Sequence, residues 1–248
     1  MSANISVLNP DQPKRVLLIV SNPTVSGTTG WPIGAWAAEF THPYWEFTER
    51  GYVVEFASPD GGKIELDTWS DPRDSSEYSA HDLLSLGFLS SPKHAALLEQ
   101  TRPLAELDPT AYDAIFLAGG QAPMFTFADN AALHQFVAQS YTAGKVVAIV
   151  CHATSILLKL RLADGSLLVE GKTWTGFANS EEAFADAFVG QRIQPFWIED
   201  EARKLANTNF IVGNRFQPFA VRDGRLITGQ QQYSGTAAAR LVIEALGV

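Results

Sequence analysis

The residues best suited to covalent chemistry are the only cysteine, Cys151, and the histidine that follows it, His152. Cys151 stands where an apolar strand pattern gives way to a helix pattern. In open α/β sheets the functional crevice lies at the carboxyl ends of the strands. The amides of a helix N-terminus favour negative charge and lower a thiol pKa, so one interpretation is a reactive thiolate held on a sharp turn. The other is a small buried hydrophobe, the commonest fate of a lone cysteine.

His152 can act on Cys151 only if the turn between them is non-helical, because adjacent residues of a regular helix do not face each other. A sharp strand-to-helix turn would supply that geometry. The alternative is that His152 is a solvent-facing histidine in the first turn of the helix. The five histidines are His42, His81, His94, His134 and His152. None follows position 152, which excludes a papain-like pair and a glutaminase-type triad. The sequence has no Gly-x-Ser-x-Gly motif of a serine hydrolase.

Glu39 is a candidate acidic site residue because of the proline that follows it in the sequence. Pro43 lies four residues later, where its ring would clash with the carbonyl of residue 39 and could not donate to it. Glu39 therefore either precedes the first turn of its helix or marks a local break. The plainer alternative is an exposed helical glutamate. Glu39 and His42 form one Glu-x-x-His pair, but carboxylate metal sites in helix bundles need two, so no metal site is predicted.

Gly119, Gly120 and Gln121 close the strand pattern next to that of the cysteine. Two glycines free the backbone to aim amide N–H groups into the crevice, which would make an oxyanion hole. The alternative is an ordinary tight turn. The motif is not Gly-x-Gly-x-x-Gly, and no phosphate-binding loop occurs in the sequence, so no nucleotide cofactor is expected.

Four short apolar runs are the expected strands that position these residues, at 16–20, 53–57, 114–118 and 146–150. Runs that are apolar on both faces are typical of a parallel sheet covered by helices. Apolar residues at helical spacing predict helices between them. The first of these carries Trp36, Phe40, Tyr44 and Phe47 and ends before Gly51. The second carries Leu133, Phe136, Val137 and Tyr141, between a cap at Asp129 or Asn130 and a stop at Gly144.

Two further helices are expected, one from Cys151 or His152 to about Leu160 and one from a Ser234 cap to Leu246. Alternating strands and helices predict an α/β fold with a doubly wound, mostly parallel, flavodoxin-like sheet. Residues 63–107, with helical pieces at 83–89 and 94–98, break the alternation. We expect them to form a cap-like insertion within a single domain, 1–248, because they are too few for a core of their own. Residues 219–228 predict a hairpin around an Asp-Gly turn.

The composition of the 248 residues excludes several classes of protein. Apolar residues make up 46% and charged residues 18%, which is enough for a sizeable buried core and excludes a disordered chain. The formal net charge of −9 makes nucleic acid and membrane surfaces unsuitable partners. A single cysteine cannot build a disulfide framework. Residues 1–15 contain no apolar signal region, and no apolar run approaches the roughly 20 residues of a membrane span. We therefore expect a soluble, cytoplasmic protein.

Seven motifs follow one another along the chain: GAWAAEFTHPY at 34–44, FASPDGG at 56–62, AGG at 118–120, AIVCH at 148–152, EGKT at 170–173, PFWIE at 195–199 and DGRLITGQ at 223–230. Together they resemble the ThiJ/PfpI superfamily, also called class I glutamine amidotransferase-like, and most of all its glyoxalase III and heat-shock chaperone branch. The resemblance runs from about Arg15 to the C-terminus. It implies that Cys151 is the nucleophile and His152 its partner. It also implies that Glu39 hydrogen-bonds the thiol and that Glu182 orients the histidine.

The sequence departs from this branch at three places around the expected pocket. Gln121 stands where the branch has His, and Ala153-Thr154 stand where it has Gly-Pro. Residues 229–234 replace its Gly-Gln-Asn-Pro-Ala-Ser and introduce Tyr233, which we expect to narrow or reshape the entrance. The residues expected to bind the substrate and its oxyanion are Gly119, Gly120, Gln121 and Tyr233.

The resemblance predicts a glyoxalase III-like enzyme that needs no metal or other cofactor. It would convert a small 2-oxoaldehyde such as methylglyoxal to the 2-hydroxy acid through a hemithioacetal on Cys151. One alternative is a thiol-dependent amidase, deglycase or hydratase. Two others are a stress holdase chaperone and a redox sensor that uses the same thiol. The resemblance also favours a homodimer.

Overall fold

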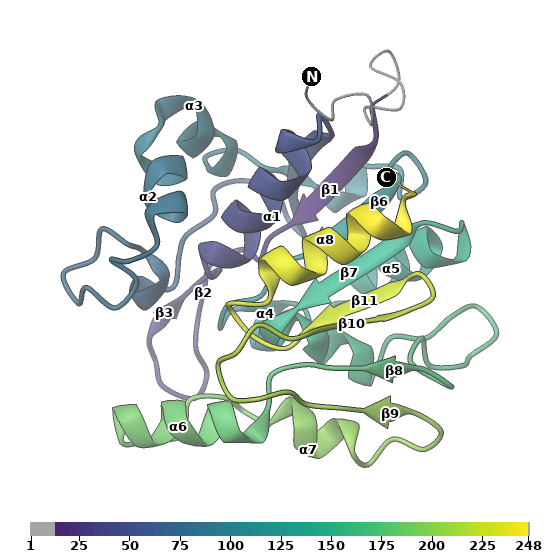
Figure 1. Cartoon of the computed structure of the whole chain (residues 1–248). Helices are drawn as coiled ribbons and strands as arrows, with labels where there is room; N and C mark the ends of the chain where they lie inside the picture. The colour runs from purple at the N-terminus through teal and green to yellow at the C-terminus, as the bar shows by residue number, and fades with distance from the viewer. Residues whose placement is uncertain (1–12, 248) are drawn as a thin grey trace.

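A seven-stranded sheet forms the centre of the computed structural model, which describes residues 13–247. Its strands are β1 (Arg15–Ile19), β4 (Val53–Ser58), β5 (Arg102–Pro103), β6 (Ala114–Leu117), β7 (Val146–Val150), β10 (Ala220–Asp223) and β11 (Leu226–Gly229). Their order is β10-β11-β7-β6-β1-β4-β5 (Figure 1). Every neighbouring pair is parallel except the β10–β11 hairpin. Residues 1–12, on which the expectation of a cytoplasmic protein partly rests, lie outside the described residues.

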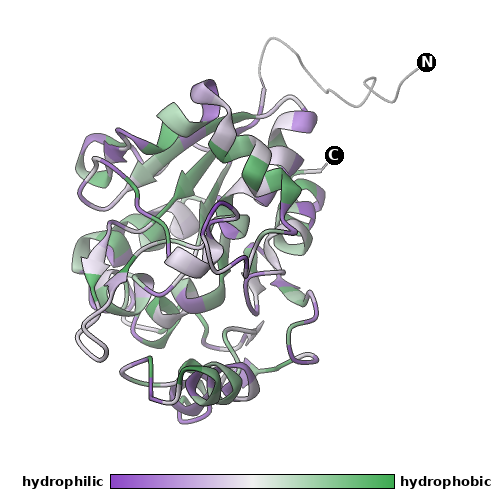
Figure 2. Cartoon of the chain, turned by 90° about the vertical axis from the view of Figure 1, so that its left-hand side faces the viewer, coloured by the Kyte–Doolittle hydropathy of each residue, from purple (hydrophilic) through white to green (hydrophobic). Residues whose placement is uncertain are grey.

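The four apolar runs expected to be strands are β1, β4, β6 and β7, so this prediction is confirmed to within a residue or two at each end. All residues of β6 and β7 are buried, as are four of the five residues of β1. Figure 2 shows these hydrophobic strands between the helices on the two sides of the sheet. Burial of both faces explains why the strands read as continuous apolar runs instead of alternating ones.

Helices cover both faces of this sheet, which confirms the doubly wound α/β fold. Helices α1 (Ala38–Glu49) and α8 (Gly235–Ala245) pack against each other on one face, and α5 (Ala131–Thr142) packs on the other (Figure 1). Helix α5 begins as expected, because the Asn130 side chain accepts a hydrogen bond from the Leu133 amide at 3.0 Å. Ser234 directly precedes α8, but the expected cap is wrong. Its hydroxyl accepts from the amides of Phe219 and Gln231 and so ties the hairpin to the helix.

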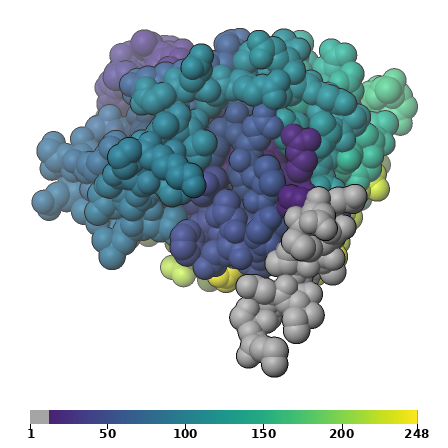
Figure 3. All heavy atoms as spheres, turned by 90° about the horizontal axis from the view of Figure 1, so that it is seen from above, coloured from purple at the N-terminus to yellow at the C-terminus, as the bar shows by residue number. Residues whose placement is uncertain are grey.

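The stretch 63–107 lies between β4 and β6 in the chain. It contains η2 (Thr68–Ser70), α2 (Leu83–Ser90), α3 (Pro92–Ala95), η3 (Ala96–Leu98), β5 and η4 (Leu104–Glu106). The two expected helical pieces are present, the second as α3 followed by the 3₁₀ turn η3. Helix α2 packs against α1, and Figure 3 shows the blue-to-teal residues of this stretch alongside the indigo residues of α1. Strand β5 extends the sheet beside β4. That the stretch is a cap-like insertion into one domain stays a prediction.

Several short elements lie outside the main sheet and complete the fold. They are β2 (Thr24–Val25), β3 (Pro32–Ile33), α4 (Pro123–Thr126), η5 (Cys151–Leu158), β8 (Thr173–Trp174), α6 (Asn179–Val189), α7 (Ile198–Ala202) and β9 (Asn209–Phe210). Strand β2 pairs with β3 and β8 with β9. In Figure 1, α6, α7, β8 and β9 lie together below the main sheet. Within residues 13–247 the structure has no helix of the length and apolar character that crossing a membrane requires.

Candidate active site

Cys151 occupies a strained turn between β7 and η5. Its φ angle is +57°, a left-handed conformation that residues other than glycine rarely adopt. Such strain is concentrated at functional sites, where the surrounding structure holds the residue in place. The helix expected after the cysteine is the 3₁₀ helix η5, and it ends at Leu158 instead of about Leu160. The turn at Cys151 therefore supplies the non-helical geometry that a Cys151–His152 contact requires.

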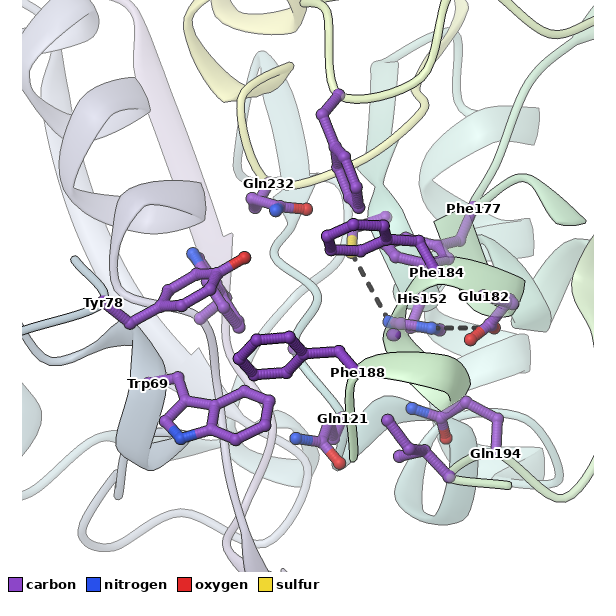
Figure 4. Close-up of a pocket in the computed structure, with 16 residues that line it drawn as sticks. Trp69, Tyr78, Gln121, His152, Phe177, Glu182, Phe184, Phe188, Gln194 and Gln232 are labelled. Carbon is purple, nitrogen blue, oxygen red and sulfur yellow. Dashed lines mark hydrogen bonds and ion pairs between the residues drawn. The ribbon is translucent and has the colours of Figure 1, made fainter. Parts of the chain in front are cut away.

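Cys151, His152 and Glu182 form a connected row of side chains. The Cys151 Sγ atom lies 3.5 Å from His152 Nδ1, and His152 Nε2 lies 3.1 Å from Glu182 Oε1 (Figure 4). A carboxylate can only accept, so His152 Nε2 carries the proton and Nδ1 is free to accept the thiol proton. Phe177 stacks on the imidazole with ring centroids 4.1 Å apart. The ring is thus fixed by a hydrogen bond at its edge and by an aromatic contact on its face.

The pKa of His152 reflects two opposing causes. Burial, the largest single cause, lowers this pKa, but the charge and hydrogen bond of Glu182 and the charges of Glu39 and Asp67 together raise it above its usual value. His152 can therefore store a proton taken from the thiol and return it later in the reaction.

Glu39 lies on the other side of the thiol and is completely buried. Its Oε2 accepts from the Gly119 amide at 2.8 Å, its Oε1 has no hydrogen-bond partner among the described residues, and its carboxyl group is close enough to the Cys151 thiol for each to affect the pKa of the other. Glu39 lies within the first turn of α1, one residue after its start, so neither expected position is quite right. Pro43, inside the same helix, leaves the Glu39 carbonyl without its helical donor. Burial is the main reason why the pKa of Glu39 rises to about 7.

The lowered thiol pKa expected at the helix N-terminus is wrong for this site. Burial comes first, followed by the charge and hydrogen bond of Glu39, and together they raise the pKa of the Cys151 thiol well above its usual value. The amides of His152 and Gly120 hydrogen-bond the sulfur and favour the thiolate, but they do not outweigh burial. Cys151 is only 3% exposed, yet it lines a pocket. A nucleophilic thiolate therefore depends on transfer of the thiol proton to His152.

Gly119 and Gly120 bring the backbone close to the thiol. A Cβ atom at Gly119 would lie 2.7 Å from Glu39 Oε2 and 2.8 Å from the Cys151 Cβ, and Gly120 has a φ of +109°. No other residue fits this turn without displacing the groups around it. The amides of Gly120 and His152 both point to the sulfur, so they can hold an oxygen that becomes negative on the neighbouring carbon.

Asp67 is a part of the site that the sequence analysis missed. Its Oδ1 accepts from the Gly34 amide at 2.9 Å and its Oδ2 from the Gln121 amide at 2.7 Å. The carboxylate thereby holds the loop that carries Gly120. Asp67 is buried, and burial raises its pKa to about 6. It comes from the stretch 63–107, where no spacing or motif distinguishes it from the other acids.

Replacing Asp67 by asparagine is expected to lower the kcat of a reaction at Cys151 by roughly 10-fold. An amide side chain can accept from one of the two backbone N–H groups but turns its own N–H₂ toward the other, which costs about one hydrogen bond. Steady-state kinetics and a thermal melt check this. A variant that melts like the wild type and keeps full kcat would show that Asp67 does not position the loop.

The pocket above the sulfur is mainly aromatic, and with its open mouth included it encloses about 650 Å³. We call seven of its lining side chains the aromatic wall: Trp36, Trp69, Tyr78, Phe177, Phe184, Phe188 and Phe216. Gln121 also lines the pocket, as expected. Gln232 lines it where Tyr233 was expected. Tyr233 is 37% exposed. Burial is the main reason why the pKa of Tyr78 is raised, and the charge of Tyr233 adds to the rise. Tyr233 therefore lies close to Tyr78, beside the mouth of the pocket.

The structure therefore brings Cys151, His152, Glu39 and Glu182 into one site. Their roles in a reaction remain predictions. Among residues 13–247, no group of three or more His, Cys, Asp or Glu side chains is arranged to hold a metal ion. The aromatic wall was not foreseen, because its members come from distant segments of the chain and only Phe184 and Phe188 share a helix.

Comparison with known proteins agrees with this geometry. The chain is 28% identical to glutathione-independent glyoxalase HSP31 of Saccharomyces cerevisiae, over 94% of this chain and 98% of that protein. It superposes on the crystal structure of glyoxalase III from Candida albicans with a TM-score of 0.75 and 26% identity, covering 94% and 97% of the two chains. For the Rapid Encystment Protein of Francisella tularensis the TM-score is 0.83 and the identity 26%, covering 95% of this chain and 100% of that one. The model of the DJ-1/PfpI family matches residues 34–245. A match over this much of the chain means that the protein belongs to the DJ-1/PfpI family.

Proposed function

We propose that the protein is a glutathione-independent glyoxalase that converts a 2-oxoaldehyde to the corresponding 2-hydroxy acid. The observation that carries the proposal is the row Cys151–His152–Glu182, with Glu39 on the other side of the sulfur. The relatives named glutathione-independent glyoxalase, which align over nearly the whole chain, support it.

The reaction begins when the Cys151 sulfur attacks the aldehyde carbon and the thiol proton passes to His152. The aldehyde oxygen becomes negative beside the amides of Gly120 and His152 and then takes the proton, which gives a hemithioacetal. Glu39, when protonated, donates a hydrogen bond to the sulfur and favours the thiolate.

The hydride-equivalent step is an internal transfer that needs no outside oxidant. His152 removes the hydrogen of the hemithioacetal carbon as a proton, the electron pair forms a double bond to the ketone carbon, and the ketone oxygen takes a proton to give the enediol. The former ketone carbon is then protonated, while the hydroxyl on the former aldehyde carbon loses its proton and becomes the thioester carbonyl. The aldehyde carbon is thereby oxidised to a thioester and the ketone carbon reduced to an alcohol. Water cleaves the thioester, which releases the 2-hydroxy acid and restores the thiol.

The proposal is tested by incubating the protein with methylglyoxal in the presence of a chelator and the absence of glutathione, and following lactate by NMR. Formation of lactate with a rate proportional to enzyme is the expected result. Failure to form the corresponding 2-hydroxy acid from methylglyoxal and from each of a set of larger 2-oxoaldehydes would contradict it. Release of ammonia or of an amine from an amide substrate would instead favour the hydrolase alternative.

Glu182→Gln is expected to lower kcat by about 10-fold. A neutral amide still accepts the His152 Nε2–H, but it loses the difference between a charged and a neutral hydrogen bond. Because Glu182 raises the pKa of His152, the acidic limb of the pH–rate profile should move to lower pH in this variant. An unshifted limb would show that Glu182 has only a structural role.

The holdase alternative, the homodimer and the cytoplasmic location stay predictions. Suppression of client aggregation that persists in Cys151→Ala would separate a holdase from the enzyme. Light scattering of the purified protein would measure the oligomeric state.

A further inference from the structure

The aromatic wall offers more apolar surface than the methyl group of methylglyoxal can cover. Trp69 stacks on Tyr78 with centroids 5.8 Å apart, and Phe188 meets Trp69 edge to face at 5.5 Å. Phe184 meets Phe216 edge to face at 5.3 Å. The wall thus joins residues of the stretch 63–107 to residues of α6, across the mouth of the pocket (Figure 4).

Two rings of this wall remain exposed to solvent. Phe184 is 41% exposed and Phe188 is 62% exposed, although both line the pocket. Exposed aromatic surface gains free energy when an apolar group covers it, and aromatic pairs gain more through edge-to-face or offset stacking. A flat ring on the substrate would use both effects, whereas the methyl group of methylglyoxal would use little of either.

One buried polar group interrupts the apolar lining. The Gln194 side chain is only 1% exposed, and its Oε1 has no hydrogen-bond partner among the described residues. A buried amide oxygen without a partner costs about 1–3 kcal/mol. Figure 4 shows Gln194 and Gln121 on the same side of the pocket, below His152 and Phe188. The Gln121 Oε1 atom is also buried, and no other group of residues 13–247 pairs with it.

The chemistry of an amide indicates which partner these side chains would take. A side-chain amide has both a donor nitrogen and an acceptor oxygen, so a group that can both donate and accept suits it best. A hydroxyl group is neutral, and it both donates and accepts. It can therefore pair with the Gln194 amide whichever way the amide is turned.

We propose that the preferred substrates are aryl 2-oxoaldehydes whose ring carries a hydroxyl group. The aldehyde carbon lies at Cys151, the ring packs within the aromatic wall, and the ring hydroxyl pairs with Gln194. This substrate class rests on the glyoxalase function proposed above and narrows it.

The test compares kcat/KM for methylglyoxal, phenylglyoxal, and the 3- and 4-hydroxy derivatives of phenylglyoxal. We expect phenylglyoxal to exceed methylglyoxal, and one hydroxy derivative to exceed phenylglyoxal by roughly 10-fold, the value of one net hydrogen bond. In Gln194→Met the ratio of hydroxyphenylglyoxal to phenylglyoxal should fall to about one. In Gln191→Met, a matched change at an exposed residue, the ratio should stay as in the wild type. Equal rates for all aryl substrates, or a ratio unchanged in Gln194→Met, would overturn the proposal.

Binding separates this proposal from the function on which it rests. Acetophenone and its 3- and 4-hydroxy derivatives lack the aldehyde, so calorimetry can measure their Kd without turnover. If no 2-oxoaldehyde is converted, the glyoxalase function fails. Tighter binding of a hydroxyacetophenone that Gln194→Met abolishes would still support the hydroxyaryl site, and equal binding of all three ketones would refute it.

Discussion

Cys151→Ala is expected to lower kcat/KM for a 2-oxoaldehyde by at least roughly 10³-fold, because the variant has no atom that can form the hemithioacetal. Removal of the nucleophile leaves only binding and the oxyanion amides. Activity is measured as 2-hydroxy acid formed without glutathione.

The alanine variant should fold as the wild type does. Alanine meets the same strain as cysteine at a φ of +57°, and the side chain that it shortens is small. Circular dichroism and a thermal melt provide the control. A folded Cys151→Ala protein with wild-type turnover would exclude the sulfur from the chemistry.

Glu39→Gln is expected to stabilise the protein by about 3 kcal/mol at and above pH 7. Burial raises the pKa of Glu39 from 4.5 to about 7, so between these pH values the folded protein holds a proton that the unfolded chain has lost. The free energy of unfolding therefore falls as pH rises through this window, and the loss persists at higher pH. Glutamine has no proton to lose, and its amide can still accept from Gly119 and donate to the sulfur.

The same substitution should change the pH dependence of catalysis. In the wild type, Glu39 stops donating to the sulfur as pH rises through about 7, and its new charge opposes the thiolate, so activity declines on the alkaline side. In Glu39→Gln this decline should disappear. Denaturant unfolding at pH 5 and pH 8 and pH–rate profiles of both proteins measure the two effects. If the pH–rate profile of the variant declines on the alkaline side as that of the wild type does, or if the variant is no more stable at pH 8, Glu39 is not the group with the raised pKa.

A gain in the free energy of unfolding in Glu39→Gln would show that the residues of the site lower the stability of the protein. Glu39 and Asp67 are buried acids with raised pKa values, and Cys151 is held at a positive φ angle. Each feature costs folding free energy, and each serves a position where chemistry can take place. This pattern is the usual exchange between stability and activity.

The strands were predictable because their burial on both faces leaves an unbroken apolar run in the sequence. Cys151, Gly119 and Gly120 were found as site candidates for the same reason, since they directly follow such runs. Glu39 was found because Pro43 marks an irregular helix. Ser234 was expected to cap α8 with its hydroxyl, but this hydroxyl accepts hydrogen bonds from the amides of Phe219 and Gln231 instead. Elements of two residues, such as β8 and β9, carry no periodicity that a sequence can reveal.

Other parts of the site depend on contacts between distant segments. Glu182 lies 31 residues after Cys151 in an ordinary first helical turn, so only the family resemblance pointed to it. Asp67 and Gln194 carry no local signal, because their significance lies in which backbone groups and which cavity they meet. The thiol pKa was predicted with the wrong sign because the helix N-terminus is visible in a sequence, whereas the burial that outweighs it is not.

The covalent intermediate on Cys151 gives the most direct test of the mechanism. Wild-type protein is mixed with phenylglyoxal, quenched with acid within milliseconds to seconds, and examined by intact mass and peptide mapping. The mechanism predicts a transient adduct with the full mass of the substrate on the peptide that contains Cys151, formed and lost in step with turnover. Continued turnover with every adduct confined to lysine or arginine peptides would contradict it.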